Sequence, residues 1–441
     1  MVSGNSLVER VEAQIAPLVP AHSTILIGLS GGADSVVLLH LLHSLAARYA
    51  WQLSALHVHH GISRNADAWA EFCAGLCERL RIPFHLERVD IAPLRGHGIE
   101  AAARKLRIAA FSRHGCDYVA LAHHADDQAE TLLLQMLRGA GVRGAGAMPV
   151  LARRAASPAL LRPLLHCARS EILDYAVAHG LQWVEDESNA NDSYPRNYLR
   201  HRVMPLLTQH FPAYRETLGR SARHFAEASQ LLDELATLDA GQALDGNAMP
   251  VATLRGLSPA RGSNLLRYFL HTQGAPMPQS AHLDEMLRQL CDARQDAAVE
   301  VRVGDFQLRR YRDSVYLLPA AAEFDRALSL PWQGEAMLGW APLAKRLYFS
   351  RTTGAGISFR KLQRAPVTLR LRNGAEVLRP HPAAAKRTLK NLLQQHRIPP
   401  WERERLPLLF CGEDLACVVG VVISAEYQAS ENEEGMSVSC E

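Results

Sequence analysis

Short apolar runs alternate with segments of helical periodicity over residues 23–187. The first run reads TILIGL, and the segment behind it has apolar residues on one side of a predicted helix. Strand and helix patterns that alternate in this way predict a parallel sheet with helices on both faces. The predicted strands are 24–29, 53–58, 83–89 and 118–122, and the predicted helices are 34–48, 65–80, 99–113 and 125–138.

The pattern changes after about residue 218. Long amphipathic helical patterns come first, and alternating runs near 320 predict a hairpin. Residues 365–428 combine strand-like runs with a basic helical pattern, AKRTLKNLLQQHR, whereas 321–364 is poorly patterned and predicts a linker. The fold class is therefore α/β, with a parallel-sheet domain over 1–217, a mainly helical domain over 218–340, and a linker plus a small α+β domain over 341–441.

Three polar motifs begin where predicted strands end. They are SGGADS at 30–35, HVHHGISRN at 57–65 and AHHADDQAE at 122–130. Ligands of open α/β sheets bind outside the carboxyl ends of the strands. We therefore expect the functional site at this edge of the sheet.

The composition describes a globular protein. A chain of 441 residues that is 48% hydrophobic can build two or three cores. Its eight cysteines form no C-x-x-C pair, which fits a reducing cytoplasm better than a disulfide scaffold. Glu9 and Glu12 interrupt the N-terminal segment where a signal peptide is apolar, and no apolar run reaches the roughly 18 residues of a membrane span. We expect a cytoplasmic protein without a membrane span, and its oligomeric state, a homodimer included, stays open.

Charge is unevenly distributed although the formal net charge is only +3. Residues 361–405 hold eleven lysines and arginines against three glutamates. A basic stretch of this kind is often only a solvated face, so nucleic-acid binding does not follow from charge alone.

The SGGADS motif has the features of a phosphate loop. A strand, two glycines and a helix N-terminus present backbone N–H groups and the positive end of a helix dipole, and Ser30 and Ser35 add hydroxyl donors. A simple tight turn is the alternative. The motif lacks the lysine of GxxxxGK[ST] and is not GxGxxG. Asp34 would repel a phosphate by roughly 4 kcal/mol at intermediate dielectric, so a cation, Mg²⁺, is predicted between them.

SGGADS resembles the SGGxDS loop of the PP-loop (N-type ATP pyrophosphatase) superfamily, whose members split ATP between its α and β phosphates. Within that superfamily the chain resembles the tRNA(Ile)-lysidine synthetases. This resemblance implies ATP and Mg²⁺ as cofactors, with the metal on Asp34. It implies nucleotide contacts from Ser30, Gly31, Gly32, Ala33, Asp34, Ser35 and His123. The matching stretches are 57–69, 100–107, 122–144, 162–165, 185–200 and 378–409.

Two carboxylates mark a second site. Asp127 and Glu130 are three residues apart in the predicted helix, so both can hold one cation or ammonium group. Carboxylates in a first helical turn are also ordinary dipole-favoured capping. The resemblance implies that they receive free L-lysine, and it puts His123 and Asp126 near the nucleotide or the wobble base.

Arg196 and Arg200 lie four residues apart in RNYLR, on one face of a predicted helix. An arginine pair binds a phosphate or a carboxylate in fork geometry, although surface ion pairs with the acidic run 185–187 explain the pattern equally well. The resemblance puts this pair next to the active site, so catalytic roles are predicted for Asp34, Asp127, Glu130, Arg196 and Arg200. Arg104 and Arg107 are further candidates for contacts to ATP or RNA.

Five histidines, at 57, 59, 60, 123 and 124, raise the alternative of a metal centre. No cysteine or carboxylate follows them at zinc-ligand spacing, so zinc is disfavoured. The glycine-rich segment 138–144 is either a loop that approaches RNA or a plain helix C-cap.

The resemblance implies a ligase that forms a C–N bond. It would join lysine to C2 of the wobble cytidine of tRNA(Ile) with the anticodon CAU, through an adenylated cytidine, and give lysidine, AMP and pyrophosphate. The codon specificity then changes from AUG to AUA. A PP-loop thiolase of tRNA, an amide ligase for a small metabolite and a non-catalytic RNA-binding module are the alternatives. For a tRNA substrate, phosphate contacts from the basic helix become the better interpretation.

Overall fold

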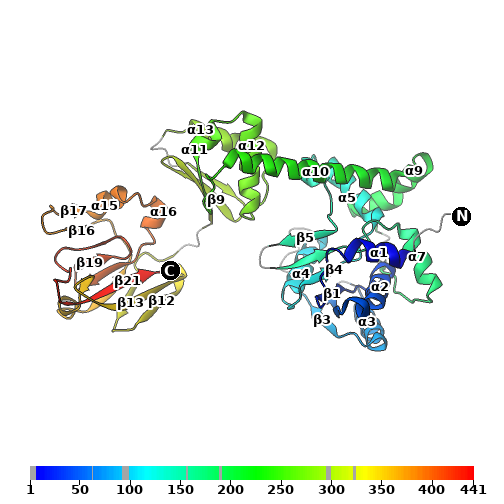
Figure 1. The fold of residues 1–441 in the computed structure, drawn as a ribbon, viewed down its shortest axis with the longest axis horizontal. Helices are drawn as coiled ribbons and strands as arrows, with labels where there is room; N and C mark the ends of the chain where they lie inside the picture. Colours follow the sequence, from blue (N-terminus) through cyan, green and yellow to red (C-terminus); the bar gives the residue numbers. More distant parts are fainter. Residues whose placement is uncertain are drawn as a thin grey trace. The chain divides into compact units, whose positions relative to one another are not determined.

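The computed structural model describes residues 6–61, 63–91, 99–154, 157–187, 191–294, 299–320 and 324–441. Residues 62 and 188–190 of the motifs above, and 321–323 of the predicted linker, lie outside the described residues. The chain forms two compact units, Met1–Leu235 and Ala236–Glu441 (Figure 1). No helix of the described chain is long and apolar enough to cross a membrane.

A six-stranded sheet forms the centre of the first unit. Its order is β3-β2-β1-β4-β6-β5, with β5 antiparallel to β6 and all other neighbours parallel. The predicted parallel sheet is confirmed, and the antiparallel edge strand is an addition that the pattern did not predict. The strands are β1 Thr24–Gly28, β2 Gln52–His59, β3 Phe84–Arg88, β4 Tyr118–Ala120, β5 Leu151–Arg154 and β6 Ser157–Leu161.

The strand order reverses beside β1. The chain runs from β1 outward through β2 to β3 and then returns to form β4 on the other side of β1. Open α/β sheets bind their ligands at such a switch point, outside the carboxyl ends of the strands. The loops that follow β1 and β4 carry SGGADS and AHHADDQAE, so the topology brings these two motifs to one place.

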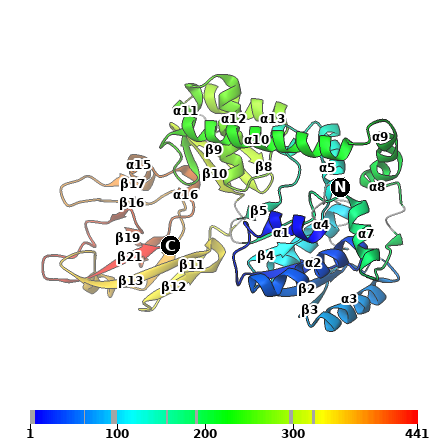
Figure 2. The same ribbon diagram turned by 45° about the vertical axis from the view of Figure 1, so that its right-hand side comes forward.

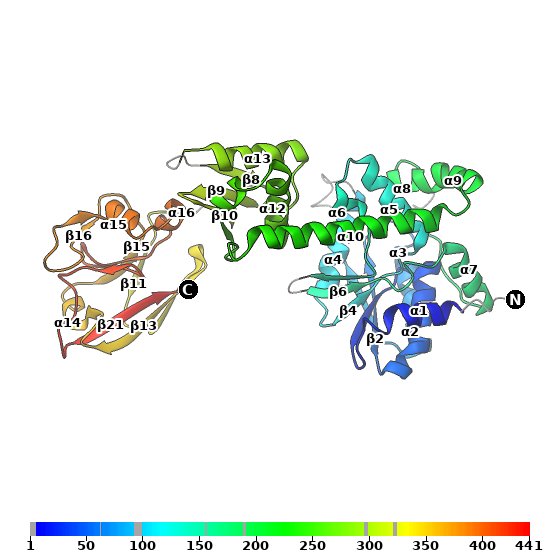
Figure 3. The same ribbon diagram turned by 45° about the horizontal axis from the view of Figure 1, so that its top comes forward.

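Helices cover both faces of this sheet (Figures 1 and 3). Ile25 and Ile27 of β1 belong to a core with α1, α2, α3 and α7, whereas Leu26 packs with Phe111 of α4. Each of these buried side chains stabilises the fold by about 1.5–3 kcal/mol, so β1 is held firmly from both sides. The helices are α1 Leu7–Ile15, α2 Ala33–Tyr49, α3 Ala66–Leu80, α4 Ile99–Ser112, α5 Ala125–Leu137, α6 Val142–Ala145 and α7 Arg169–Ala178.

A second layer of helices lies against α5. Ala129 of α5, Met204 of α9 and Tyr214 of α10 form a small buried cluster. A π-helical turn, Leu199–Val203, joins α8 to α9. These helices are α8 Pro195–Tyr198, α9 Met204–His210 and α10 Tyr214–Ala240.

The second unit begins with helices packed on a four-stranded antiparallel sheet of order β7-β10-β9-β8. The predicted hairpin near residue 320 is present as part of this sheet, in which β9 pairs with β10. The elements are β7 Ala248–Pro250, α11 Val251–Arg255, α12 Pro259–Thr272, α13 Ser280–Asp292, β8 Glu300–Val303, β9 Phe306–Tyr311 and β10 Ser314–Pro319.

Two antiparallel sheets, β11-β15-β18-β19-β20 and β12-β13-β21-β14, form the end of the chain, beside a short β16-β17 ladder. The helical stretches are η4 Ala341–Leu343, α14 Phe359–Leu362, α15 Leu389–Gln395 and α16 Pro400–Arg403. The strands are β11 Ser329–Trp332, β12 Met337–Trp340, β13 Lys345–Thr353, β14 Ile357–Ser358, β15 Val367–Arg370, β16 Val377–Leu378, β17 Arg387–Thr388, β18 Leu408–Cys411, β19 Asp414–Val418, β20 Val422–Ile423 and β21 Glu434–Cys440.

The prediction of a linker over 321–364 is wrong for its described part. This segment contains β11 to β14, and β13 pairs along its length with β21 at the far end of the chain (Figure 2). Strands β11 and β13 are half-buried, and they pair with β15 and β21, which lie further along the chain, so local patterning indicates them only weakly. The basic helix is shorter than predicted: α15 begins at Leu389, where the Thr388 hydroxyl accepts from the Asn391 N–H at 3.4 Å.

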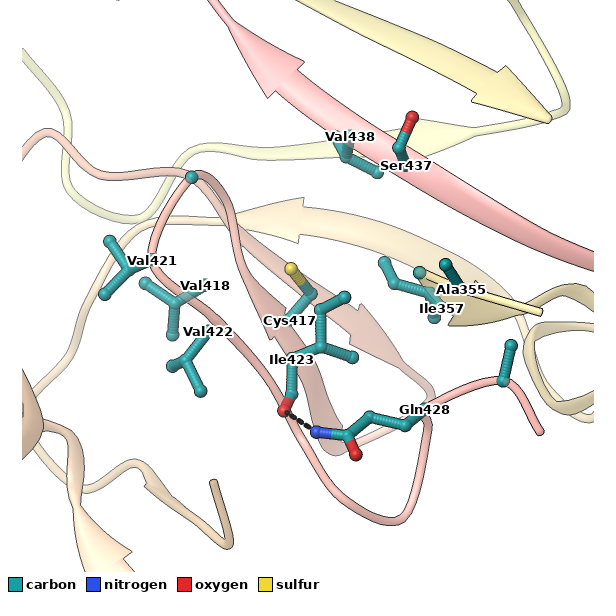
Figure 4. Close-up of a pocket in the computed structure, with 13 residues that line it drawn as sticks. Ala355, Ile357, Cys417, Val418, Val421, Val422, Ile423, Gln428, Ser437 and Val438 are labelled. Atoms are coloured by element: carbon teal, nitrogen blue, oxygen red, sulfur yellow. Dashed lines mark hydrogen bonds between the residues drawn. The ribbon is translucent and has the colours of Figure 1, made fainter. Parts of the chain in front are cut away.

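A cavity of about 510 Å³ lies between the two C-terminal sheets (Figure 4). Ile357, Cys417 and Val438 are among its apolar walls, and the Gln428 side chain lies at its edge, donating to the carbonyl of Ile423 at 3.1 Å. The described residues that line it include no charged side chain. It therefore has no acid, base or phosphate-binding group of its own.

Candidate active site

The loop after β1 makes its turn at Gly31. This residue has φ of +90°, and its carbonyl accepts from the Val184 N–H at 3.0 Å. A Cβ at position 31 would lie 2.8 Å from Val184 Cγ2 and 3.2 Å from Cys73 Sγ. The loop thus needs glycine here for its backbone conformation and for space.

Gly31→Ala is predicted to lower the free energy of unfolding by about 2 kcal/mol or more, since it combines a left-handed backbone with a steric clash. Gly32→Ala is the matched control, because Gly32 has φ of −71° and an added Cβ would meet only ordinary contacts. Urea unfolding of both variants checks this. Equal stability of the two proteins would contradict the role given to Gly31.

The first turn of α2 is free of side-chain caps. Gly32 is its N-cap and supplies no capping side chain, so no side chain caps this helix N-terminus, although the Ser35 N–H donates to the Gly32 carbonyl at 3.0 Å. Ser30 Oγ lies 3.1 Å from Ser35 Oγ and accepts from the Gly32 N–H at 3.4 Å. Two hydroxyls and a helix N-terminus therefore converge in one loop, as the sequence predicted.

Asp34 lies in this first turn with one oxygen unsatisfied. Its Oδ1 is buried without a hydrogen-bond partner, and its Oδ2 lies 3.8 Å from Nε2 of His124. Burial raises the pKa of Asp34, and the nearby His124 and Arg169 side chains only partly oppose this. A buried carboxylate oxygen without a partner fits a ligand for Mg²⁺, which takes one or two carboxylates and completes its shell with phosphates and water.

Helix α5 begins at a reciprocal cap between His124 and Asp127. The Asp127 N–H donates to Nδ1 of His124 at 3.4 Å, and the His124 N–H donates to Oδ2 of Asp127 at 3.0 Å. The capping interpretation of this acidic turn is therefore correct for one oxygen of Asp127. Its other oxygen remains available for a different partner.

Asp127, Glu130, Arg196 and Arg200 form one cluster. Arg196 Nε and Arg200 Nε donate to the two oxygens of Glu130 at 2.8 and 2.7 Å. The Nη2 groups of both arginines donate to Oδ1 of Asp127 at 3.0 and 3.1 Å. Because the Glu130 side chain is only 1% exposed, its charge is stable only with these partners.

The side chains of Arg196 and Arg200 extend toward the same partners, as their spacing of four residues predicts. Arg196 lies on α8 and Arg200 on the π-helical turn, and both reach the same carboxylates. Asp127 and Glu130 are ion-pair partners of both arginines, and Glu187 of the acidic run accepts from Asn65. Pi-helical turns are rare and often occur at functional sites.

His123 lies beside this cluster as a neutral imidazole. Its Nδ1 is buried without a hydrogen-bond partner. Burial lowers the pKa of His123 to about 3, and the positive charges of Arg162, Arg196 and Arg104 contribute in the same direction. The ring can therefore exchange a hydrogen bond with a ligand without carrying charge.

Asp126 joins α5 to two other helices. Its oxygens accept from Nε of Arg215, at the start of α10, and from the backbone N–H of Arg169, at the start of α7. Burial alone would raise the pKa of Asp126, but these two donors hold it below its usual value. Both oxygens of Asp126 have protein partners. Asp126 therefore has a structural role, in addition to the predicted contact to the base.

The other basic candidates lie at the edge of the site. Arg104 and Arg107 are exposed on α4, and Arg107 helps to lower the pKa of His60 to about 4, for which burial is the main cause. In the glycine-rich segment, Arg138 caps α5 and Gly141 opens α6, so the C-cap interpretation applies. Arg143 pairs with Asp233.

His57 has a structural role. His57 Nδ1 bonds the carbonyl of Leu29 at 2.9 Å, with Cys73 Sγ at 3.6 Å, so both side chains lie directly beneath the phosphate loop. Burial raises the pKa of the Cys73 thiol to about 12. Among the residues that the structure describes, no three His, Cys, Asp or Glu side chains are grouped to hold a metal ion.

His124 and Arg215 are the residues that sequence reasoning missed. The position of His124 directly before a predicted helix is a capping signal that could have identified it. Arg215 is far from the motifs in sequence, and no local pattern marks it.

The fold and site define a PP-loop protein with appended substrate domains. A family model described as PP-loop domain matches residues 6–207. Two others, described as TilS substrate binding domain and TilS substrate C-terminal domain, match residues 249–316 and 367–440. The PP-loop domain implies that the chain binds ATP, and the substrate domains imply that it binds tRNA.

Full-length relatives identify the family. The tRNA(Ile)-lysidine synthase of Nitrosomonas europaea is 43% identical over 97% of this chain and 93% of the relative. The enzyme of the same name from Aromatoleum aromaticum is 42% identical over 96% and 98%, and that of Coxiella burnetii is 37% identical over 95% and 93%. The chain belongs to the tRNA(Ile)-lysidine synthase family.

Proposed function

We propose that the protein ligates L-lysine to C2 of the wobble cytidine of tRNA(Ile) with the anticodon CAU. The observation that carries the proposal is the proximity of two sites. Asp34 of the phosphate loop and Asp127 of the carboxylate–arginine cluster both lie within 4 Å of the His124 imidazole. The same edge of the sheet thus offers a place for ATP beside a place for an amino acid.

The first step joins the base to ATP. The cytosine O2 forms a bond to the α phosphorus, and the bond from that phosphorus to the bridging oxygen breaks and releases pyrophosphate. The open N–H groups of α2, with Ser30 and Ser35, stabilise the charge that grows on pyrophosphate. Asp34 would hold Mg²⁺, which supplies further charge neutralisation when it is bound.

The second step joins lysine to the activated base. The neutral ε-amine attacks C2, AMP leaves with the bonding electrons, and the amine loses its proton. The cluster holds two negative and two positive side chains, which matches the ammonium and carboxylate groups of a free amino acid. Lysine would exchange partners with the arginines, which frees a guanidinium for its carboxylate or for a phosphate.

The tRNA requires a larger surface than this site. In the second unit, Leu389, Leu392 and Leu393 of α15 are buried, whereas Arg387, Lys390 and Arg397 are exposed. This amphipathic arrangement leaves the basic side chains for contacts to RNA phosphates. The wobble base must leave its stack, which costs little in a single-stranded loop. Because ATP and tRNA are intracellular substrates, we place the reaction in the cytoplasm.

Thiolation is the alternative that the cysteines disfavour. Burial raises the pKa of Cys73 to about 12 and that of Cys77 to about 11. Such thiols are unreactive near neutral pH, because the thiolate is the nucleophile.

Product analysis tests the function. The protein is incubated with ATP, Mg²⁺, lysine and bulk tRNA. The tRNA is then digested to nucleosides, whose masses are measured by mass spectrometry. We expect a cytidine that is heavier by one lysine minus water, together with AMP and pyrophosphate. Reactions without lysine or with the Asp34→Ala variant are the controls. Binding of tRNA without this nucleoside would refute the proposal, and AMP release that needs no tRNA would indicate an amide ligase for a small metabolite.

A further inference from the structure

His124 lies between the two carboxylates that the reaction requires. Its side chain is only 2% exposed, and its Nε2 is 3.3 Å from Oδ2 of Asp127 and 3.8 Å from Oδ2 of Asp34. The first carboxylate belongs to α5 and the second to the phosphate loop and α2. One imidazole therefore faces both the amino-acid site and the nucleotide site.

Asp34 and Asp127 are arranged alike: in each carboxylate one oxygen lies near His124 and the other has different surroundings. The Oδ2 atom of each lies within 4 Å of Nε2 of the imidazole, and that of Asp127 also accepts from the His124 backbone N–H at 3.0 Å. The Oδ1 atom of Asp127 accepts from Arg196 and Arg200, and the Oδ1 atom of Asp34 is buried without a partner. Each carboxylate thus keeps one oxygen for His124 and offers the other to its own ligand.

The hydrogen bond at the other ring nitrogen determines the tautomer. Nδ1 accepts from the Asp127 N–H at 3.4 Å, so the proton of the neutral ring is on Nε2. Nε2 lies within 4 Å of two anionic oxygens, which would repel each other without this ring nitrogen between them. A ring held by one nitrogen that orients ligands with the other is a familiar arrangement around metal sites.

We propose that His124 is a positioning residue that sets which oxygen Asp34 offers to the Mg²⁺–ATP complex and which oxygen Asp127 offers to lysine. It acts through the two carboxylates and touches neither reactant. The inference rests on the proposed function. The competing explanation is that His124 only caps α5.

Two substitutions separate these explanations, because the amide of each one replaces a different nitrogen of the imidazole ring. In His124→Asn the short amide replaces Nδ1, and asparagine is among the best N-cap residues, so the cap is kept and the bridge is lost. In His124→Gln the longer amide presents an N–H near the place of Nε2, so the bridge is kept and the cap is lost. Together they form a matched pair of opposite design.

Three measurements follow each variant. Thermal unfolding reports on the cap. Calorimetry with a non-hydrolysable ATP analogue, at several Mg²⁺ concentrations and without tRNA, reports on Asp34. The KM and kcat for lysine in lysidine formation report on Asp127.

For His124→Asn we expect an unchanged unfolding midpoint, a Mg²⁺ requirement for analogue binding that rises about tenfold, and a similar rise in the KM for lysine. For His124→Gln we expect a midpoint about 2–4 °C lower and both binding values within about threefold of wild type. The reverse order, or wild-type binding in both variants, would overturn the proposal. Because calorimetry needs no turnover, a failure of His124 in this role is distinguishable from a wild-type protein that makes no lysidine.

Discussion

Asp34→Ala is expected to reduce pyrophosphate release by a factor of at least roughly a hundred to a thousand. The substitution removes the one carboxylate of the phosphate loop whose Oδ1 is buried without a protein partner. The affinity for tRNA should stay unchanged, because we propose that this carboxylate serves the nucleotide and not the RNA. Single-turnover release of pyrophosphate and filter binding of tRNA measure the two effects.

The pH dependence of protein stability provides a second test at Asp34. Burial raises the pKa of Asp34 above its value in the unfolded chain, so the ionised carboxylate destabilises the folded protein at neutral pH. Stability linked to this group is present below the unfolded pKa of about 4 and is lost as the pH rises through the folded pKa. Asp34→Asn should therefore raise the unfolding midpoint at pH 7 without nucleotide, and this gain should vanish near pH 3. A lower midpoint at pH 7, or loss of tRNA binding, would show that Asp34 has a structural role instead.

Glu130→Ala is expected to lower the free energy of unfolding by about 3–5 kcal/mol, because it leaves Arg196 and Arg200 largely buried without one of their two anions. The surface pair Arg10–Glu171 is the matched control. Its separation is 2.7 Å, similar to that of Arg200 and Glu130, but both side chains are 40% exposed. Glu171 also accepts from the Ala168 N–H at the start of α7, so Glu171→Ala removes a helix cap as well and should still cost only about 1–2 kcal/mol.

Activity measurements complete the test of Glu130. Lysine use should weaken more than pyrophosphate release, since Glu130 is predicted to serve the second step. Glu130→Gln keeps the shape and one acceptor, and it should lie between wild type and Glu130→Ala in both measurements. If pyrophosphate release fails first, the assignment of lysine to this cluster is wrong.

Local periodicity predicted the sheet of the first unit because strands that are buried on both faces can be recognised from the sequence pattern alone. Ile25, Leu26 and Ile27 are buried on both faces of the sheet, and such strands are continuous apolar runs in the sequence. Motifs at the ends of these strands then meet at the switch point whatever their separation along the chain. The position of the site therefore followed from the order of its elements.

Other features depend on contacts that no local pattern contains. Strand β13 is half-buried, and its partner β21 lies at the far end of the chain. The spacing of Asp127 and Glu130 predicted a shared face but could not show that Arg196 and Arg200 already occupy it. His124 was visible only as one histidine among five, since its importance arises from the two carboxylates that folding brings to its ring.

Cys73 makes the phosphate loop observable. Its sulfur lies directly under Gly31, and its thiol is inert while it is buried. An alkylating reagent can reach it only after the packing around it opens, and lifting of the phosphate loop is one such opening, so the labelling rate of the peptide that contains Cys73 reports on that motion. Bound ATP should lower the alkylation rate of Cys73. The native sequence thus contains its own reporter of how often the phosphate loop opens.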